Sequence, residues 1–128
     1  MSIVGHGIDL VDCGRIAKLL ERHGQQFLDR VLTPAEQERA ARLRDPTQFV
    51  AGRWAAKEAI LKMIGTGWRG KIDWTDMETL PDELGRPCVT LSGETARIAA
   101  DRGIERVLLS ITHTDGQAVA SAIGLSGR

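Results

Sequence analysis

Residues 52–67 read GRWAAKEAILKMIGTG, and this stretch decides the fold. Its apolar residues at positions 56, 59, 60 and 63 recur at the i, i+3, i+4 and i+7 spacing of one helix face. We therefore predict a long central helix over residues 47–64, which ends at Gly65 because glycine suits a left-handed position after a helix. The opposite face of this helix is expected to carry Trp54, Glu58, Leu61 and Lys62.

Shorter helices are predicted on the N-terminal side of this stretch. Asp12 can cap a first helix that ends at Gly24 in a left-handed conformation. Residues 33–36, Thr-Pro-Ala-Glu, form a capping box with proline at the first helical position, which starts a helix through about Leu43. Asp45-Pro46 then separates this helix from the central one.

The second half of the chain predicts strands. Residues 77–80, 87–91, 106–112 and 118–125 are strand-like, and a short helix over residues 93–102 is expected after a Ser92 cap. Asp115-Gly116 predicts a tight turn, so the last two strands should form an antiparallel hairpin. We expect one α+β domain over residues 1–128, with antiparallel strands packed against the central helix.

The first strand has an unusual face. In strand periodicity Val4, His6, Ile8 and Leu10 share one face, and Gly5, Gly7, Asp9 and Val11 share the other. Glycine weakens a strand unless something must come close to its backbone, so a ligand or another chain is expected against these glycines. A β-bulge is the alternative explanation.

Glu58 and Lys62 lie one helical turn apart. Taken alone they would be an exposed pair worth only about 0.2 to 0.5 kcal/mol to the helix. Together with Asp9 they give two carboxylates and a lysine, and Mg²⁺ is usually held by one or two carboxylates plus waters and substrate phosphates. The residues therefore indicate a divalent-metal and phosphate site. Gly65-Thr66-Gly67 lets a phosphate approach the backbone, although such a sequence after a helix is often only a C-cap.

Composition narrows the class of protein. The 17 basic and 17 acidic residues balance, which gives little support to a general nucleic-acid-binding role. Cys13 and Cys88 lie far apart without a metal-ligand spacing, so both are expected as reduced thiols. No signal peptide or membrane span is indicated, and a cytoplasmic protein is the expectation.

The first helix carries two different flanks. Ile16, Leu19, Leu20 and His23 are predicted to face inward, whereas Arg15, Lys18 and Arg22 recur along a basic flank. This basic flank is either an ordinary solvated face or a docking surface for an acidic partner, because aligned cations steer anionic surfaces.

Four motifs in order carry a family resemblance. They are GIDLV at residues 7–11 with Arg15-Ile16 following, the run at 52–67, ELGRP at 83–87 and SITHT at 110–114. With these motifs the chain resembles the holo-acyl-carrier-protein synthases, the short type of 4'-phosphopantetheinyl transferase, over nearly its whole length. Trp54 stands where this family more often has phenylalanine, and Thr112 where a second serine is common.

The resemblance implies Mg²⁺-dependent transfer of 4'-phosphopantetheine from coenzyme A to a serine of an apo acyl carrier protein, in support of fatty acid biosynthesis. It implies Asp9 and Glu58 as metal ligands and Lys62 as the third catalytic group, with Lys57 the less favoured lysine. The general base is left open between Glu58, Asp9 and a metal-bound water. Coenzyme A contacts are expected from Arg53, Lys62, Gly65, Thr66, Arg86, Pro87, His113 and Thr114.

The resemblance also implies partners. The carrier protein would dock on Arg15, Lys18 and Arg22, and a homotrimer would build each coenzyme A site between neighbouring subunits. In that case Arg86, His113 and Thr114 would come partly from the next chain. Two rival hypotheses are a non-catalytic coenzyme A or nucleotide-binding module and a purely structural oligomerisation domain.

Overall fold

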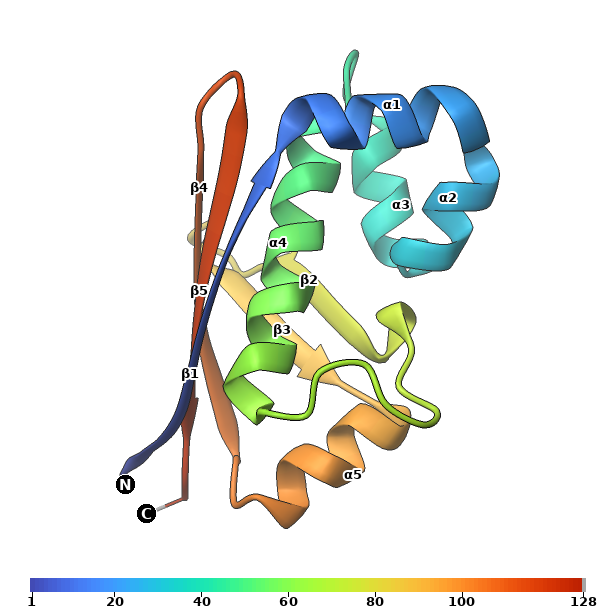
Figure 1. Cartoon of the computed structure of the whole chain (residues 1–128). Coiled ribbons are helices and arrows are strands. Elements are labelled where there is room, and N and C mark those ends of the chain that lie inside the picture. The colour runs from blue at the N-terminus through green and yellow to red at the C-terminus, as the bar shows by residue number, and fades with distance from the viewer. Residues whose placement is uncertain (128) are drawn as a thin grey trace.

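The computed structural model describes residues 1–127 and places the helix α4 (Thr47–Ile64) against a three-stranded antiparallel sheet. The sheet has the order β1 (Ile3–Asp12), β5 (Gln117–Leu125), β4 (Arg106–His113). A second hairpin, β2 (Met77–Pro81) and β3 (Pro87–Leu91), lies behind α4 as viewed in Figure 1. The predicted α+β architecture with a long central helix is thus confirmed.

The other helices surround α4 on the side away from the sheet (Figure 1). They are α1 (Cys13–His23), α2 (Gln25–Val31), α3 (Pro34–Ala41), α5 (Gly93–Asp101) and a 3-10 turn η1 (Trp74–Asp76). The predicted capping box of α3 is confirmed, because the Glu36 amide donates to Thr33 Oγ1 and the Thr33 amide donates to Glu36 Oε1. The sequence did not lead us to expect α2.

The glycines of β1 pack against α4. A Cβ built on Gly5 would collide with the carbonyl group of Met63, and one built on Gly7 would collide with the carbonyl of Ala59. The expected close approach is therefore real, but the approaching backbone is a helix of the same chain. The pairing of β1 with β5 also shifts in register between Ile3 and Gly5, so the strand is irregular there.

Two local expectations about helices are wrong, those for His23 and Gly24. Leu61, on the face of α4 opposite the apolar stripe, is only 1% exposed, because neighbouring elements cover more than one face of α4. His23 is exposed at the end of α1, whereas Ile16 of the same predicted stripe is fully buried. Gly24 has φ +52° and ψ −126°, which is a positive φ but not the left-handed helical conformation.

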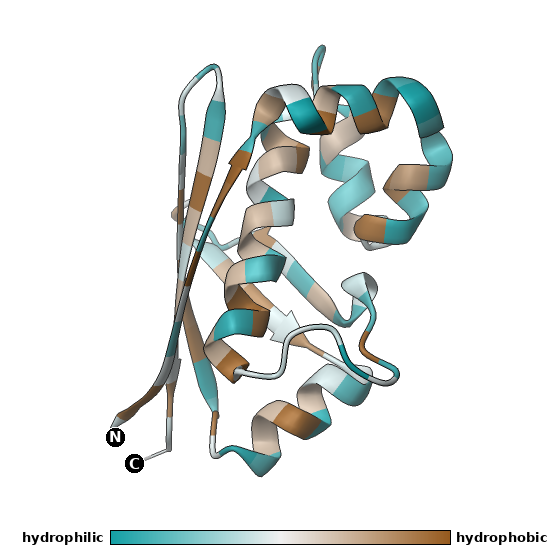
Figure 2. Ribbon diagram, viewed as in Figure 1, coloured by the Kyte–Doolittle hydropathy of each residue, from teal (hydrophilic) through white to brown (hydrophobic). Residues whose placement is uncertain are grey.

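The outer face of the three-stranded sheet is apolar and exposed. Alternate residues of β1 and one of β4 leave large apolar side chains uncovered, namely Ile8 at 55%, Leu10 at 57%, Val4 at 44% and Leu108 at 45% exposure. Brown segments in Figure 2 mark such apolar residues on β1 as well as along α4. Among residues 1–127, no helix is long and apolar enough to cross a membrane.

Candidate functional site

Asp9 and Lys62 form an ion pair that joins β1 to α4. The Lys62 Nζ lies 3.1 Å from Asp9 Oδ1 and 3.1 Å from the Ile8 carbonyl oxygen, and it donates to both. The Asp9 side chain is 16% exposed and the Lys62 side chain 55% exposed. The short aspartate reaches the helix because the glycines before it let the strand lie directly on α4. The structure therefore brings these two predicted site residues together.

Glu58 lies on α4 one turn before Lys62. Its Oε1 accepts a hydrogen bond from Trp68 Nε1 at 3.2 Å. The side chain borders a hollow of about 480 Å³ that is also lined by Trp54, Trp68 and Trp74. Glu58 is thus accessible from a concave surface while one of its oxygens is already held.

The donor set fits a magnesium ion. Among residues 1–127, no group of three or more His, Cys, Asp or Glu side chains is gathered as a metal site. Asp9 and Glu58 alone would supply two hard carboxylate ligands and leave the remaining positions to water or phosphate oxygens. That division is the usual one for Mg²⁺, which rarely has an all-protein cage.

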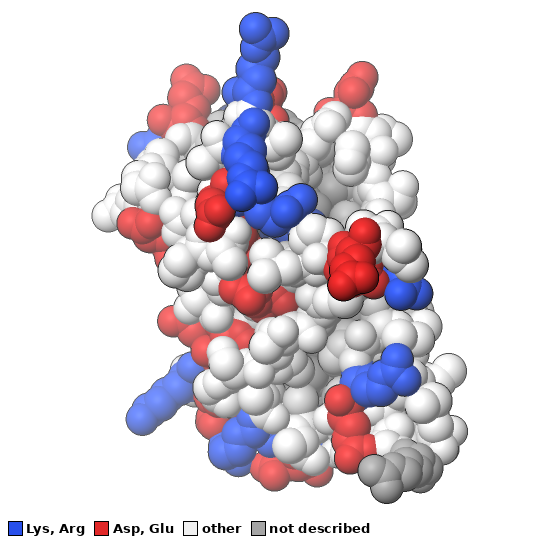
Figure 3. Space-filling model, turned by 180° about the vertical axis from the view of Figure 1, so that it is seen from behind, with Lys and Arg blue, Asp and Glu red and all other residues white. Residues whose placement is uncertain are grey.

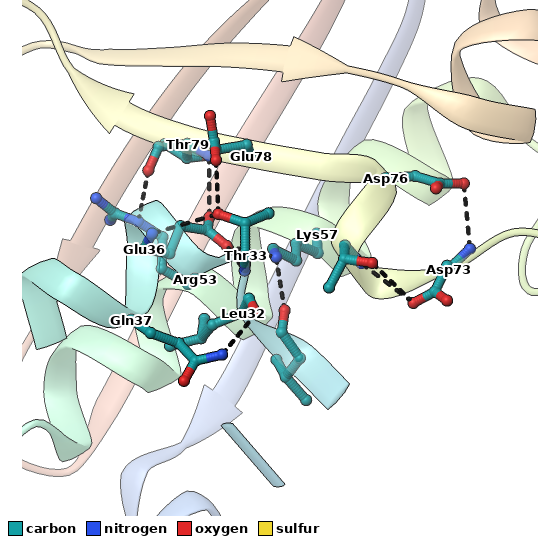
Figure 4. A network of polar contacts seen from close by, with 12 residues as sticks. Leu32, Thr33, Glu36, Gln37, Arg53, Lys57, Asp73, Asp76, Glu78 and Thr79 are labelled. Carbon is teal, nitrogen blue, oxygen red and sulfur yellow. Dashed lines mark hydrogen bonds and ion pairs between the residues drawn. The ribbon is translucent and has the colours of Figure 1, made fainter. Parts of the chain in front are cut away.

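Lys57, the neighbour of Glu58 in sequence, points into the core instead (Figure 4). Its Nζ lies 2.7 Å from Glu36 Oε1 and 2.6 Å from the Val31 carbonyl oxygen. Both charged side chains are fully buried. Burial lowers the pKa of the Lys57 ammonium, and the Glu36 carboxylate opposes that shift. Lys57 is therefore a structural cation, which agrees with the preference for Lys62 as the catalytic lysine.

Arg53 is a half-buried residue of α4 whose side chain reaches β2. Its Nε donates to the Thr79 carbonyl oxygen at 3.1 Å, and its guanidinium carbon lies 4.4 Å from the centre of the Phe49 ring. Burial lowers the pKa of Arg53, with the charge of Arg39 adding to the shift and that of Glu36 opposing it. Figure 3 shows Lys and Arg side chains at both ends of the face seen from behind, with acidic side chains among them.

Gly65 and Thr66 follow α4 as predicted. Gly65 has φ +88° and ψ 15° and closes the helix in the left-handed conformation, which its missing Cβ permits. The Thr66 hydroxyl donates to the carbonyl oxygen of Gly67 at 2.9 Å. Both residues therefore have local structural roles at the end of the helix that also carries Glu58.

Arg86 and Pro87 lie on the β2–β3 hairpin. The Arg86 side chain is 74% exposed and its Nε donates to Asp82 Oδ2 at 3.0 Å. Both residues line a groove of about 870 Å³ between β3 and β4, together with apolar side chains such as Val89 and Leu109. This groove does not include the Asp9 carboxylate or Glu58.

His113 and Thr114 lie where β4 enters the turn to β5. His113 is exposed. In the sheet it is paired with Ala118 of β5, and Ala118 is paired on its other side with Val11 of β1. The Thr114 Oγ1 accepts from the amides of Gly116 at 3.3 Å and Gln117 at 3.1 Å, so it stabilises the hairpin turn.

The predicted site residues therefore fall into two groups within one chain. Asp9 and Lys62 meet where β1 lies on α4, and Glu58 lies on α4 one turn before Lys62, whereas His113 lies on β4, two strands away from β1. Adjacent strands are about 4.8 Å apart, so β5 separates the two outer strands by about 10 Å. Arg86 lines the groove between β3 and β4, which includes none of these four residues.

The basic flank of α1 is exposed as expected, with Arg15, Lys18 and Arg22 all open to solvent. The Arg15 guanidinium carbon lies 5.1 Å from the centre of the Trp54 ring, within range of a cation–π interaction. Arg15 and Trp54 also line a hollow of about 480 Å³ between α1, α2 and α4, with Phe27 at its base.

The sequence did not lead us to expect a row of three indoles in contact, whose planes are tilted to one another by 36° and 43°. Trp54 and Trp74 have ring centres 4.4 Å apart, and Trp74 and Trp68 are also 4.4 Å apart. The row connects the hollow beside α1 to the Trp68 hydrogen bond with Glu58. The available signal was that all three tryptophans of the chain fall within residues 54–74.

Comparison with known proteins gives consistent matches over nearly the whole chain. A family model described as the 4'-phosphopantetheinyl transferase superfamily matches residues 5–121. A holo-[acyl-carrier-protein] synthase of Koribacter versatilis is 43% identical over 121 residues, which are 94% of this chain and 97% of that protein.

Solved structures agree with these sequence matches. The crystal structure of holo-[acyl-carrier-protein] synthase from Neisseria meningitidis aligns with a TM-score of 0.89 and 33% identity, covering 98% of this chain and 100% of that one. A holo-(acyl-carrier-protein) synthase from Bacillus anthracis in complex with CoA (3',5'-ADP) aligns with a TM-score of 0.82 and 38% identity, covering 98% of each chain.

Proposed function

Since this chain belongs to the holo-[acyl-carrier-protein] synthases of the 4'-phosphopantetheinyl transferase superfamily, we propose that Asp9 and Glu58 hold Mg²⁺ where the enzyme transfers phosphopantetheine from coenzyme A. The observation that carries this proposal is the Asp9–Lys62 ion pair, one helical turn from Glu58. Two carboxylates and one ammonium group on adjoining elements match a site for a divalent cation and a pyrophosphate.

The transfer exchanges one phosphorus–oxygen bond for another. The serine oxygen of the carrier protein forms a bond to the phosphorus that carries pantetheine, and the bridging oxygen leaves with adenosine 3',5'-bisphosphate. The serine proton passes to a carboxylate of the Asp9–Glu58 pair or to a water that the pair holds. When bound, Mg²⁺ neutralises phosphate charge and orients the pyrophosphate. Lys62, which is 55% exposed, reaches a phosphate oxygen and stabilises the leaving group.

We assign the remaining coenzyme A contacts to residues of α4 and of the segment that follows it, of the β2–β3 hairpin, and of the turn after β4. Arginine suits this role because the guanidinium fork matches phosphate oxygens. The exposed Arg86 would exchange Asp82 for a phosphate. The Bacillus anthracis protein, solved in complex with CoA (3',5'-ADP), supports coenzyme A as the ligand. The proposed set comprises Arg53, Gly65, Thr66, Arg86, Pro87, His113 and Thr114.

Two observations support a homotrimer with shared active sites. The outer face of the β1–β5–β4 sheet exposes the large apolar side chains of Ile8, Leu10 and Leu108, and exposed apolar surface of this kind favours association. The predicted coenzyme A residues are also split between two separate parts of one chain. A neighbouring subunit would supply Arg86, His113 and Thr114 to the carboxylates of the first.

We further propose that the acceptor is the carrier protein of fatty acid biosynthesis, and that the reaction takes place in the cytoplasm. The docking surface would be the exposed basic flank of α1, formed by Arg15, Lys18 and Arg22. Aligned cations of this kind attract an acidic partner and raise its association rate.

The test is the intact mass of an apo acyl carrier protein after incubation with this enzyme, coenzyme A and Mg²⁺. We expect a gain of one phosphopantetheine group, which is lost in chelator and in Glu58→Gln. The matched control is Glu38→Gln, because that glutamate is 71% exposed and its surface ion pair contributes little. Full transfer by Glu58→Gln, or full transfer in chelator, would refute the metal assignment.

A further inference from the structure

Trp68 lies on the segment between α4 and η1, close to two glycines. Gly67 and Gly70 have φ values of +63° and +53°, a range that favours glycine. These turns carry the chain back past the end of α4. Trp68 therefore lies over the turn of α4 that contains Glu58, ten residues before it in the sequence. Its side chain remains 42% exposed.

Two contacts fix the indole of Trp68. Its ring centre lies 4.4 Å from that of Trp74, which lies 4.4 Å from that of Trp54. Its Nε1 lies 3.2 Å from Glu58 Oε1 and donates to it. The tilted contact with Trp74 and the hydrogen bond to Glu58 together orient the N–H donor toward the carboxylate.

The chemistry of this donor differs from that of the lysine beside Asp9. Indole has one N–H donor, no acceptor and no charge, so it holds a carboxylate without neutralising it. Lys62, in contrast, places a positive charge against Asp9. The hydrogen bond to Oε1 leaves Glu58 Oε2 available and keeps the full negative charge of the carboxylate for a cation.

We infer that Trp68 is a positioning residue for Glu58, which holds its carboxylate in the orientation that binds the divalent cation. This inference rests on the proposed function, because it takes Glu58 as a cation ligand. Carboxylates that bind metals are commonly held by such hydrogen bonds, and loss of the partner typically costs about 10- to 100-fold in metal affinity or activity.

The experiment measures Mn²⁺ binding rather than turnover. Free Mn²⁺ is counted by its electron paramagnetic resonance spectrum in the presence of the enzyme and adenosine 3',5'-bisphosphate. Trp68→Phe removes the N–H donor and keeps an aromatic ring on Trp74. Incorporation of 3-benzothienylalanine at position 68 keeps the size of the indole and replaces its N–H by sulfur.

We expect both replacements to weaken Mn²⁺ binding by about 10- to 100-fold. Trp54→Phe is the matched control, because it changes another indole of the same row, one that lines the same hollow as Glu58 but donates no hydrogen bond to it, and it should keep the cation affinity. Far-UV circular dichroism checks folding, and the benzothienyl enzyme decides the question if Trp68→Phe does not fold.

Glu58→Gln distinguishes a failure of the proposed metal site from a failure of the role assigned to Trp68. If Glu58→Gln binds Mn²⁺ as tightly as the unchanged enzyme, the proposed metal site is wrong. If Glu58→Gln loses binding while the benzothienyl enzyme keeps it or binds more tightly, the metal site stands and the role of Trp68 is refuted.

Discussion

Lys57→Met should destabilise the protein strongly, although it removes no group that contacts substrate. The Lys57–Glu36 pair is fully buried, and each partner makes further hydrogen bonds. Glu36 accepts from the amides of Thr33 and Thr79, both at 2.9 Å, so the pair joins the start of α3 to α4 and β2. Methionine keeps the length of the side chain but leaves a buried carboxylate without its cation.

The expected cost follows from that burial. Removing one partner of a buried ion pair costs about 3 to 5 kcal/mol, because the other charge remains uncompensated. Whole domains are stable by only about 5 to 15 kcal/mol, so the variant should lose a large fraction of its free energy of unfolding. In Lys57→Met/Glu36→Gln the orphaned charge is also removed, and we expect more than half of the loss to be recovered.

The assay is urea unfolding at pH 7, followed by far-UV circular dichroism at one fixed protein concentration. Lys18→Met is the control, since it replaces an exposed lysine and should change the free energy of unfolding by no more than about 0.5 kcal/mol. A loss below about 1 kcal/mol in Lys57→Met, or a double variant less stable than the single one, would show that the Lys57–Glu36 pair does not stabilise the fold in this way.

Three further outcomes are expected. Arg15→Glu/Arg22→Glu should raise the KM for the carrier protein about 10-fold or more and flatten its salt dependence, while leaving coenzyme A affinity unchanged by calorimetry. Leu10→Lys places a charge on the exposed apolar sheet face and should shift the mass in analytical ultracentrifugation from trimer to monomer; an unchanged mass argues against that interface. Iodoacetamide should modify the exposed Cys88 first and reach Cys13 only at higher pH, because burial and the nearby Asp12 and Asp115 raise the pKa of the Cys13 thiol. Peptide mass spectrometry of samples modified at several pH values checks this order.

Local signals account for the parts of the fold that the sequence predicted well. The bounds of α4 follow from a long periodic run closed by Gly65, and the start of α3 follows from the Thr33 capping box. Both signals act within one or two helical turns. The helix α2 was missed because its seven residues have no side-chain cap within the described structure, and only Phe27 and Val31 are buried.

Contacts between distant residues account for what the sequence could not predict. Lys57 and Glu58 are adjacent in the sequence and both are charged, yet Lys57 is fully buried and Glu58 borders a hollow. The partners of Lys57 are Val31 and Glu36, which precede it by 26 and 21 residues. No periodicity within α4 specifies them, because they depend on how α2 and α3 fold over this helix.

The alternation of β1 links the candidate site to the proposed assembly. Asp9 faces α4 on the inner side of the sheet, while Ile8 and Leu10, directly beside it in sequence, point to the exposed outer side. A subunit that covers the outer side therefore packs within one strand thickness of the Asp9 backbone. In our proposal the apolar residues of this strand fix the neighbour, and the neighbour brings the Arg86 and His113 groups that one chain keeps apart from its own carboxylates. A motif of five residues, GIDLV, would then encode both a ligand and the surface that completes its site.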